Sequence, residues 1–127
     1  MTSRTLAGHV VEFQDCHELG QAGPDTCTMS IDGEPVIRRL LFGSPHSLRF
    51  HPTPLEYQGD VLAPLWHATR FHLVRIDPRS LEVRLANGWM NRWGYGFMRL
   101  LSVAGDEVEF CTSVWDESQK RTIKLRT

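Results

Sequence analysis

The last third of the chain alternates apolar and polar side chains with a period of two, and this pattern restricts it to β-strands with one buried face. In residues 81–85 three aliphatic side chains alternate with a glutamate and an arginine, and Asn87-Gly88 then gives a strong hairpin signal. A three-residue loop ending at Gly88 sets Leu85 opposite Trp89 and puts the aliphatic and tryptophan rows on one face. A two-residue turn separates these rows, so the sequence favours the longer loop.

Two further hairpins are expected downstream, and both keep their apolar side chains on this same face. The first turns at residues 104–107, and the second turns in a polar connection over residues 115–122. The expected cross-strand pairs are Val103 with Val108, Leu101 with Phe110, Arg99 with Thr112, and Val114 with Ile123. Because the three hairpins agree on one apolar face, the sequence predicts an antiparallel meander over the C-terminal part of the chain.

The first eighty residues carry weaker strand signals. The expected segments are a strand in 5–13, a hairpin around Asp32-Gly33 from 26–31 and 35–42, short strands at 47–51 and 55–58, and one long strand over 65–76. A helix over residues 77–88 is a competing interpretation, because an aspartate N-cap and a proline begin it and a glycine ends it. The strict alternation in residues 81–85 favours a strand there instead.

These segments predict a single all-β domain over residues 1–127, with about nine or ten strands. We expect an antiparallel small β-barrel, closed or nearly closed, because closure removes the exposed edges that so many strands create. A β-sandwich is the alternative architecture.

Composition and motifs exclude several classes of function. The net charge is −1, and 12 arginines accompany only 2 lysines, so the chain lacks the overall charge of a polyanion-binding protein. Three cysteines without CxxC spacing, and an N-terminus without a signal-like apolar run, predict a cytoplasmic protein with reduced thiols. No segment is apolar enough to suggest a membrane span. The histidine spacing and the lack of nucleotide-binding glycine motifs lead us to expect no metal and no cofactor.

The candidate ligand site consists of polar and aromatic residues on the expected inner face of the meander. Its members are Trp89, Asn91, Trp93, Tyr95, Arg99 and Thr112. An arginine buried among aromatic side chains needs a carboxylate, water or an anionic ligand as its partner. Alternatively, a bulge at Gly94 or Gly96 changes the parity of the strand and turns Arg99 toward solvent.

Two histidines are candidate catalytic residues beside Arg99. On a single strand over residues 65–76, His67 and His72 fall on opposite faces, so one of them is expected to point inward. An inward imidazole can act as a general base near neutral pH, and the alternative is a core histidine whose hydrogen bonds are satisfied.

Together these residues favour a small-molecule-binding barrel with a cavity lined by aromatic side chains and arginine. Arg99 would hold a carboxylate or enolate of an apolar ligand, and an isomerase or cyclase reaction is compatible with a nearby histidine. The alternative is a protein-interaction module, such as an inhibitor, an immunity protein or an assembly subunit, whose acidic N-terminal part and arginine-rich middle could pair in a homo-oligomer. The low net charge and few lysines disfavour single-stranded nucleic-acid binding.

Overall fold

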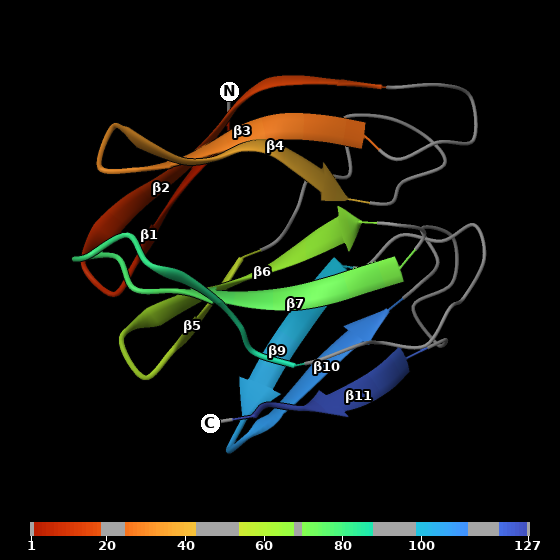
Figure 1. The fold of residues 1–127 in the computed structure, drawn as a ribbon. Coiled ribbons are helices and arrows are strands. Elements are labelled where there is room, and N and C mark those ends of the chain that lie inside the picture. The colour runs from red at the N-terminus through yellow and green to blue at the C-terminus, as the bar shows by residue number, and fades with distance from the viewer. Residues whose placement is uncertain are drawn as a thin grey trace.

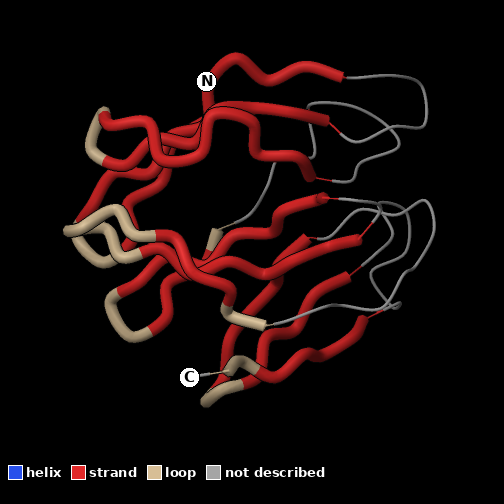
Figure 2. Tube along the Cα trace, viewed as in Figure 1, coloured by secondary structure: helices blue, strands red, loops and turns tan. Residues whose placement is uncertain are grey.

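The computed structural model describes residues 2–18, 25–42, 54–67, 70–87, 99–111 and 120–126. Within these residues the chain forms three antiparallel sheets and no helix (Figures 1 and 2). The strands are β1 (Thr2–Leu6), β2 (His9–Glu18), β3 (Asp25–Ile31), β4 (Glu34–Phe42), β5 (Leu55–Tyr57), β6 (Asp60–His67), β7 (Arg70–Ile76), β8 (Val83–Leu85), β9 (Arg99–Ala104), β10 (Glu107–Cys111) and β11 (Lys120–Lys124). The described part of the chain therefore contains no helix long and apolar enough to cross a membrane.

The three sheets are stacked, and each is a simple meander. The N-terminal sheet has the strand order β1-β2-β3-β4, the middle sheet β5-β6-β7-β8, and the C-terminal sheet β11-β10-β9. Figure 1 shows the N-terminal sheet on one side of the middle sheet and the C-terminal sheet on the other. None of the three sheets closes on itself within the described residues, so the all-β class is confirmed while the expected barrel is not.

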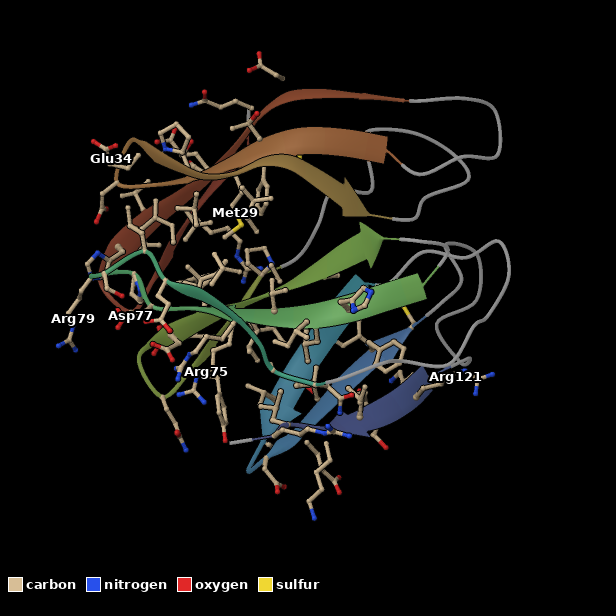
Figure 3. All side chains as sticks on the ribbon, in the orientation of Figure 1. Met29, Glu34, Arg75, Asp77, Arg79 and Arg121 are labelled. Atoms are coloured by element: carbon tan, nitrogen blue, oxygen red, sulfur yellow. The ribbon has the colours of Figure 1, made fainter. Side chains whose placement is uncertain are left out.

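The middle sheet is buried on both of its faces, because alternate residues of β6 and β7 point to opposite sides. One face forms a core with the N-terminal sheet through Val61, Ala63, Val74 and Ile76. The other face forms a core with the C-terminal sheet through Tyr57, Leu62, Leu73 and Ala86. In Figure 3 the Met29 side chain of the N-terminal sheet lies in the first of these cores.

Three hairpins have two-residue turns in which the second residue is glycine. Positive φ angles occur at Ala7 and Gly8 (52° and 81°), Asp32 and Gly33 (51° and 86°), and Gln58 and Gly59 (50° and 81°). Such paired angles define the type I′ turn, whose twist matches that of antiparallel strands. The predicted Asp32-Gly33 hairpin is thus confirmed. The single strand predicted over residues 5–13 is wrong, because the chain reverses at Ala7-Gly8 between β1 and β2.

The C-terminal sheet confirms one predicted register and corrects another. Val103 lies opposite Val108, as the alternation predicts. The register then shifts between Glu109 and Phe110. The observed pairs are Leu100 with Phe110 and Arg99 with Cys111, in place of Leu101 with Phe110 and Arg99 with Thr112. A bulge of this kind adds one residue to one strand and leaves no signal in a simple alternation of side chains.

The last hairpin of the chain is also different from its prediction. Ile123 lies opposite Val108, and not opposite Val114. The positions of Val108 and Val114 differ by an even number, so pairing with either one would place Ile123 on the same face of the sheet. Side-chain alternation predicts which face of the sheet Ile123 occupies, but it does not distinguish between two possible partners that lie on that face.

The half-buried aliphatic row predicted over residues 81–85 is confirmed at Leu81, which packs against the core of the N-terminal and middle sheets, and is wrong at Val83 and Leu85. The strand covers only Val83–Leu85, and among the described strands it is the outermost of the middle sheet, beside β7. Val83 is 40% exposed and Leu85 is 59% exposed. The pairing of Leu85 with Trp89 lies outside the described residues.

The residues that suggested a helix after Asp77 form only a single hydrogen-bonded turn, and the competing helix over residues 77–88 is wrong. The Asp77 carboxylate accepts a hydrogen bond from the backbone N–H of Arg79 at 2.9 Å, and the Leu81 N–H donates to the Asp77 carbonyl at 2.7 Å. Leu81 then takes a positive φ of 65°, which ends the turn.

The single strand predicted over residues 65–76 is in fact a hairpin. Strand β6 ends at His67 and β7 begins at Arg70, with Trp66 opposite Phe71. The sequence between the two strands is Ala68-Thr69, which contains no residue typical of a tight turn. Strands that are buried on both faces have continuous apolar sequences. Neither the periodicity nor the turn residues therefore indicated that the chain reverses between β6 and β7.

Candidate functional site

A hollow of about 260 Å³ opens on the surface where the middle sheet meets the end of the chain. It is lined by Arg75, Arg84, Leu85 and Arg126. Arg75 comes from β7, the next two residues come from β8, and Arg126 follows β11. Three of the four lining side chains therefore carry a permanent positive charge.

Strand pairing brings two of these arginines together, because Arg75 lies directly opposite Arg84 on the neighbouring strand. Like charges in this position repel each other. The Asp60 carboxylate relieves the repulsion. One of its oxygens bonds to Nε of Arg75 and lies 3.8 Å from Nη2 of Arg84.

The Arg75 side chain is held in a defined position. It is only 16% exposed, and the Asp60 carboxylate that binds it is 13% exposed. Its guanidinium carbon also lies 4.9 Å from the centre of the Tyr57 ring, which is a cation–π contact. Figure 3 shows Arg75 on the side of the middle sheet that faces away from the N-terminal sheet.

Hydrogen bonds hold the end of the chain beside β8. The backbone N–H of Arg126 donates to the carbonyl of Ala86 at 2.6 Å. The side-chain amide of Asn87 donates to the carbonyl of Lys124, also at 2.6 Å. These two bonds fix the backbone that presents Arg126 to the hollow, so the site is built from two different sheets.

Two of the arginines keep their hydrogen-bonding capacity for a ligand. Arg84 is 57% exposed, and its nearest acidic groups, Asp60 at 3.8 Å and Glu82 at 3.9 Å, lie beyond hydrogen-bond distance. The Arg126 side chain makes no ion pair or hydrogen bond with any residue that the structure describes. A planar guanidinium presents five N–H donors, so this arrangement is suited to an oxyanion.

Most of the predicted ligand residues lie outside the part of the chain that the structure describes. This holds for Trp89, Asn91, Trp93, Tyr95 and Thr112. Arg99 is the first residue of β9, opposite Cys111, and its side chain is not described.

The two candidate histidines lie on different strands of one hairpin, His67 on β6 and His72 on β7. The prediction that they lie on opposite faces of a single strand is therefore wrong. His72 is 7% exposed and lies in β7, and His67 is the last residue of β6. The buried position of His72 fits both an inward-pointing general base and a core histidine, so its role stays a prediction. The sequence pattern missed the arginine hollow because Arg75, Arg84 and Arg126 are far apart in the chain and each looks like an ordinary surface residue.

A second polar cluster joins two hairpins of the N-terminal sheet. His9 Nδ1 lies 2.6 Å from one carboxylate oxygen of Asp32, and the backbone N–H of Val10 donates to the other oxygen at 2.9 Å. The bond from His9, followed by the one from Val10, lowers the pKa of Asp32 below its ordinary value. The pair is solvent-exposed and explains the alignment of two turns without requiring a ligand.

Within the described residues, no three side chains of the metal-binding types lie close enough together to share an ion. Cys27 and Cys111 are both buried. No protein-family model, curated protein or solved structure matches this chain.

Proposed function

We propose that this protein binds a small organic anion at the hollow formed by Arg75, Arg84, Leu85 and Arg126. The observation that carries the proposal is a concave surface lined by three arginines, two from the middle sheet and one from the segment that follows β11. Repulsion between the arginines is only partly relieved by Asp60, which contacts Arg75 and Arg84, and by the exposed Glu82 beside Arg84. An anionic ligand supplies the missing negative charge.

The residues of the hollow have different roles in this proposal. Arg75, fixed by Asp60 and Tyr57, provides a rigid positive wall. Arg84 and Arg126 donate hydrogen bonds to the anionic group of the ligand. Leu85 offers an exposed apolar contact for the rest of the ligand.

The aromatic residues predicted from the sequence extend this proposal. They begin directly after Asn87, which is bonded to the chain beside the hollow. We propose that the apolar body of the ligand contacts Trp89, Trp93 and Tyr95, and that Arg99 lies at the far end of the same surface. Closure of the sheets into a barrel, and an isomerase or cyclase reaction at His67 or His72, belong to the same hypothesis.

Isothermal titration calorimetry with benzoate and with phenyl phosphate tests this function. Both compounds combine a negative charge with an apolar body. We expect saturable binding of at least one of them, weakened at least about tenfold by Arg84→Gln or Arg126→Gln. Arg79→Gln is the matched control, because Arg79 does not line the hollow and lies apart from Arg75 in Figure 3. Binding that is absent, or equal in all three variants, contradicts the proposal.

Protein interaction is the second candidate function, and exposed side chains on β8 favour it. Val83 and Leu85 lie on the same face of an edge strand, and both remain largely accessible. Exposed apolar side chains on a sheet edge are a common site of pairing with another chain. Analytical ultracentrifugation of the protein and of a Leu85→Lys variant checks this, since only an interface at β8 makes self-association depend on that side chain.

A further inference from the structure

We infer that the group bound in the arginine hollow is the dianion of a phosphate monoester. This inference rests on the proposed anion-binding function and names the class of ligand. Three observations support it: the number of arginines that line the hollow, the balance of charge around them and the volume of the hollow.

The first support is the number of donors. Three arginines line the hollow. A phosphate monoester presents three terminal oxygens, each a strong hydrogen-bond acceptor, so Arg84 and Arg126 can each bind one oxygen while the third faces the positive charge of Arg75. A carboxylate has only two oxygens and places none against Arg75.

The second support is charge. Three arginines and the Asp60 carboxylate leave two unbalanced positive charges, and a monoester close to neutral pH carries nearly two negative charges. Glu82 is the other acidic group near the hollow. It is largely exposed and lies 3.9 Å from Arg84, so water screens most of its effect.

The third support is size. The volume of about 260 Å³ falls below the range typical of pockets that enclose an entire drug-sized ligand. The hollow therefore accommodates a head group, while the remainder of the ligand extends past the exposed Leu85 side chain. A phosphodiester in a nucleic acid or a phospholipid presents one charge and two terminal oxygens, and matches the three arginines less well.

Calorimetry with four small probes at pH 7.5 tests the inference. Methyl phosphate is a dianion with three terminal oxygens, methyl sulfate is a monoanion with three, and dimethyl phosphate and acetate are monoanions with two. We expect methyl phosphate to bind at least about tenfold more tightly than each of the others. A tenfold preference corresponds to about 1.4 kcal/mol of binding free energy.

The pH dependence provides a second readout. The second ionisation of a phosphate monoester has a pKa of about 6, so lowering the pH from 7.5 to 5.0 should weaken methyl phosphate binding about tenfold. Methyl sulfate does not titrate in this range. Any effect of Asp60, Glu82 or another protein group on binding would change the affinity of methyl sulfate as well, and we expect that affinity to stay constant.

Variants identify the site. Arg84→Lys keeps the charge and loses the planar fork, so we expect a smaller loss of methyl phosphate affinity than with Arg84→Gln. Arg126→Gln should weaken binding at least about tenfold, and Arg79→Gln should have no effect. Thermal unfolding of each variant verifies that the fold is retained.

Three results overturn the inference. Acetate or benzoate that binds as tightly as methyl phosphate, with the expected effects of the arginine variants, refutes the phosphate monoester while the anion-binding function stands. Dimethyl phosphate that binds as tightly as methyl phosphate indicates a diester, as in nucleic acid or lipid. Binding of none of the probes, phenyl phosphate included, refutes both the inference and the proposed function.

Discussion

Arg75 and Arg84 lie directly opposite each other on β7 and β8, so two permanent positive charges are fixed on neighbouring strands. Asp60, on the strand at the other side of β7, contacts both of them. One carboxylate cannot neutralise two guanidinium groups, and Arg126 adds a third positive charge at the same surface. Three positive charges and two carboxylates, those of Asp60 and Glu82, therefore lie close together at one surface.

Replacement of Asp60 should have opposite effects on stability and on anion binding. Asp60→Asn leaves the largely buried Arg75 without a counter-charge, and we expect a loss of about 2 kcal/mol in the free energy of unfolding. The same change removes negative charge from the hollow, so methyl phosphate should bind more tightly. Urea unfolding and calorimetry measure the two quantities. The matched control is Asp106→Asn, because Asp106 forms an exposed ion pair with Lys124 and should contribute less than about 1 kcal/mol.

Two leucines of the middle sheet should respond very differently to truncation. Leu62 is fully buried between the middle and C-terminal sheets, so Leu62→Ala should cost about 2–5 kcal/mol. Leu85 is exposed at the sheet edge, so Leu85→Ala should change the free energy of unfolding by less than about 1 kcal/mol. Urea unfolding monitored by tryptophan fluorescence distinguishes the two, and similar losses would contradict the exposed position of Leu85.

The His9–Asp32 pair predicts a contribution to stability that depends on pH. Its hydrogen bonds lower the pKa of Asp32 in the folded protein, so they stabilise the fold at pH values above the ordinary aspartate pKa. This contribution is lost as the pH falls below about 4 toward the lowered pKa. Asp32→Asn removes the ionisable group and is suited to the positive φ at this turn. The difference in unfolding free energy between the two proteins should be constant from pH 6 to 5 and shrink below pH 4, whereas a constant difference would rule out this role.

The amide of Asn87 should control how firmly the end of the chain is held. Asn87→Ala removes the side-chain bond to the Lys124 carbonyl, with an expected cost of about 1 kcal/mol. Because Arg126 reaches the hollow from the same segment, anion affinity should fall although Asn87 does not line the hollow. Hydrogen exchange of the C-terminal peptide should accelerate at the Arg126 amide, which donates to Ala86. Unchanged exchange would show that the Asn87 side chain does not hold the segment, which would then depend on the backbone bonds from Leu125 to Asp106 and from Arg126 to Ala86.

Side-chain alternation predicted the all-β class and the pairing of Val103 with Val108, because local periodicity and turn length are sufficient for both. It did not predict the bulge beside Phe110 or the partner of Ile123, because neither changes which residues are apolar. The Asp32-Gly33 turn was recognisable from its residues, whereas alanine and glutamine at Ala7 and Gln58 are unusual at positive φ and concealed two further turns.

The arginine hollow could not be predicted for a different reason. Its three arginines belong to segments that meet only when the middle and C-terminal sheets pack together, and sequence spacing does not encode that contact. The apolar pattern pointed to Arg99 instead, since the alternate residues that precede it on its predicted face, Tyr95 and Phe97, are aromatic. The role predicted for Arg99 and its aromatic neighbours remains a prediction.

Burial of the middle sheet on both faces has a consequence for how the chain tolerates variation. Among residues 9–15 of β2, whose burial the structure describes, only Val11 and Phe13 are fully enclosed, so a saturation mutagenesis scan should find sensitive positions there separated by permissive ones. In β6 the four consecutive residues 61–64 are all enclosed. Substitutions should therefore be poorly tolerated at all four of these consecutive positions. Substitutions that change binding are expected instead at the edges of this sheet, where the arginines lie.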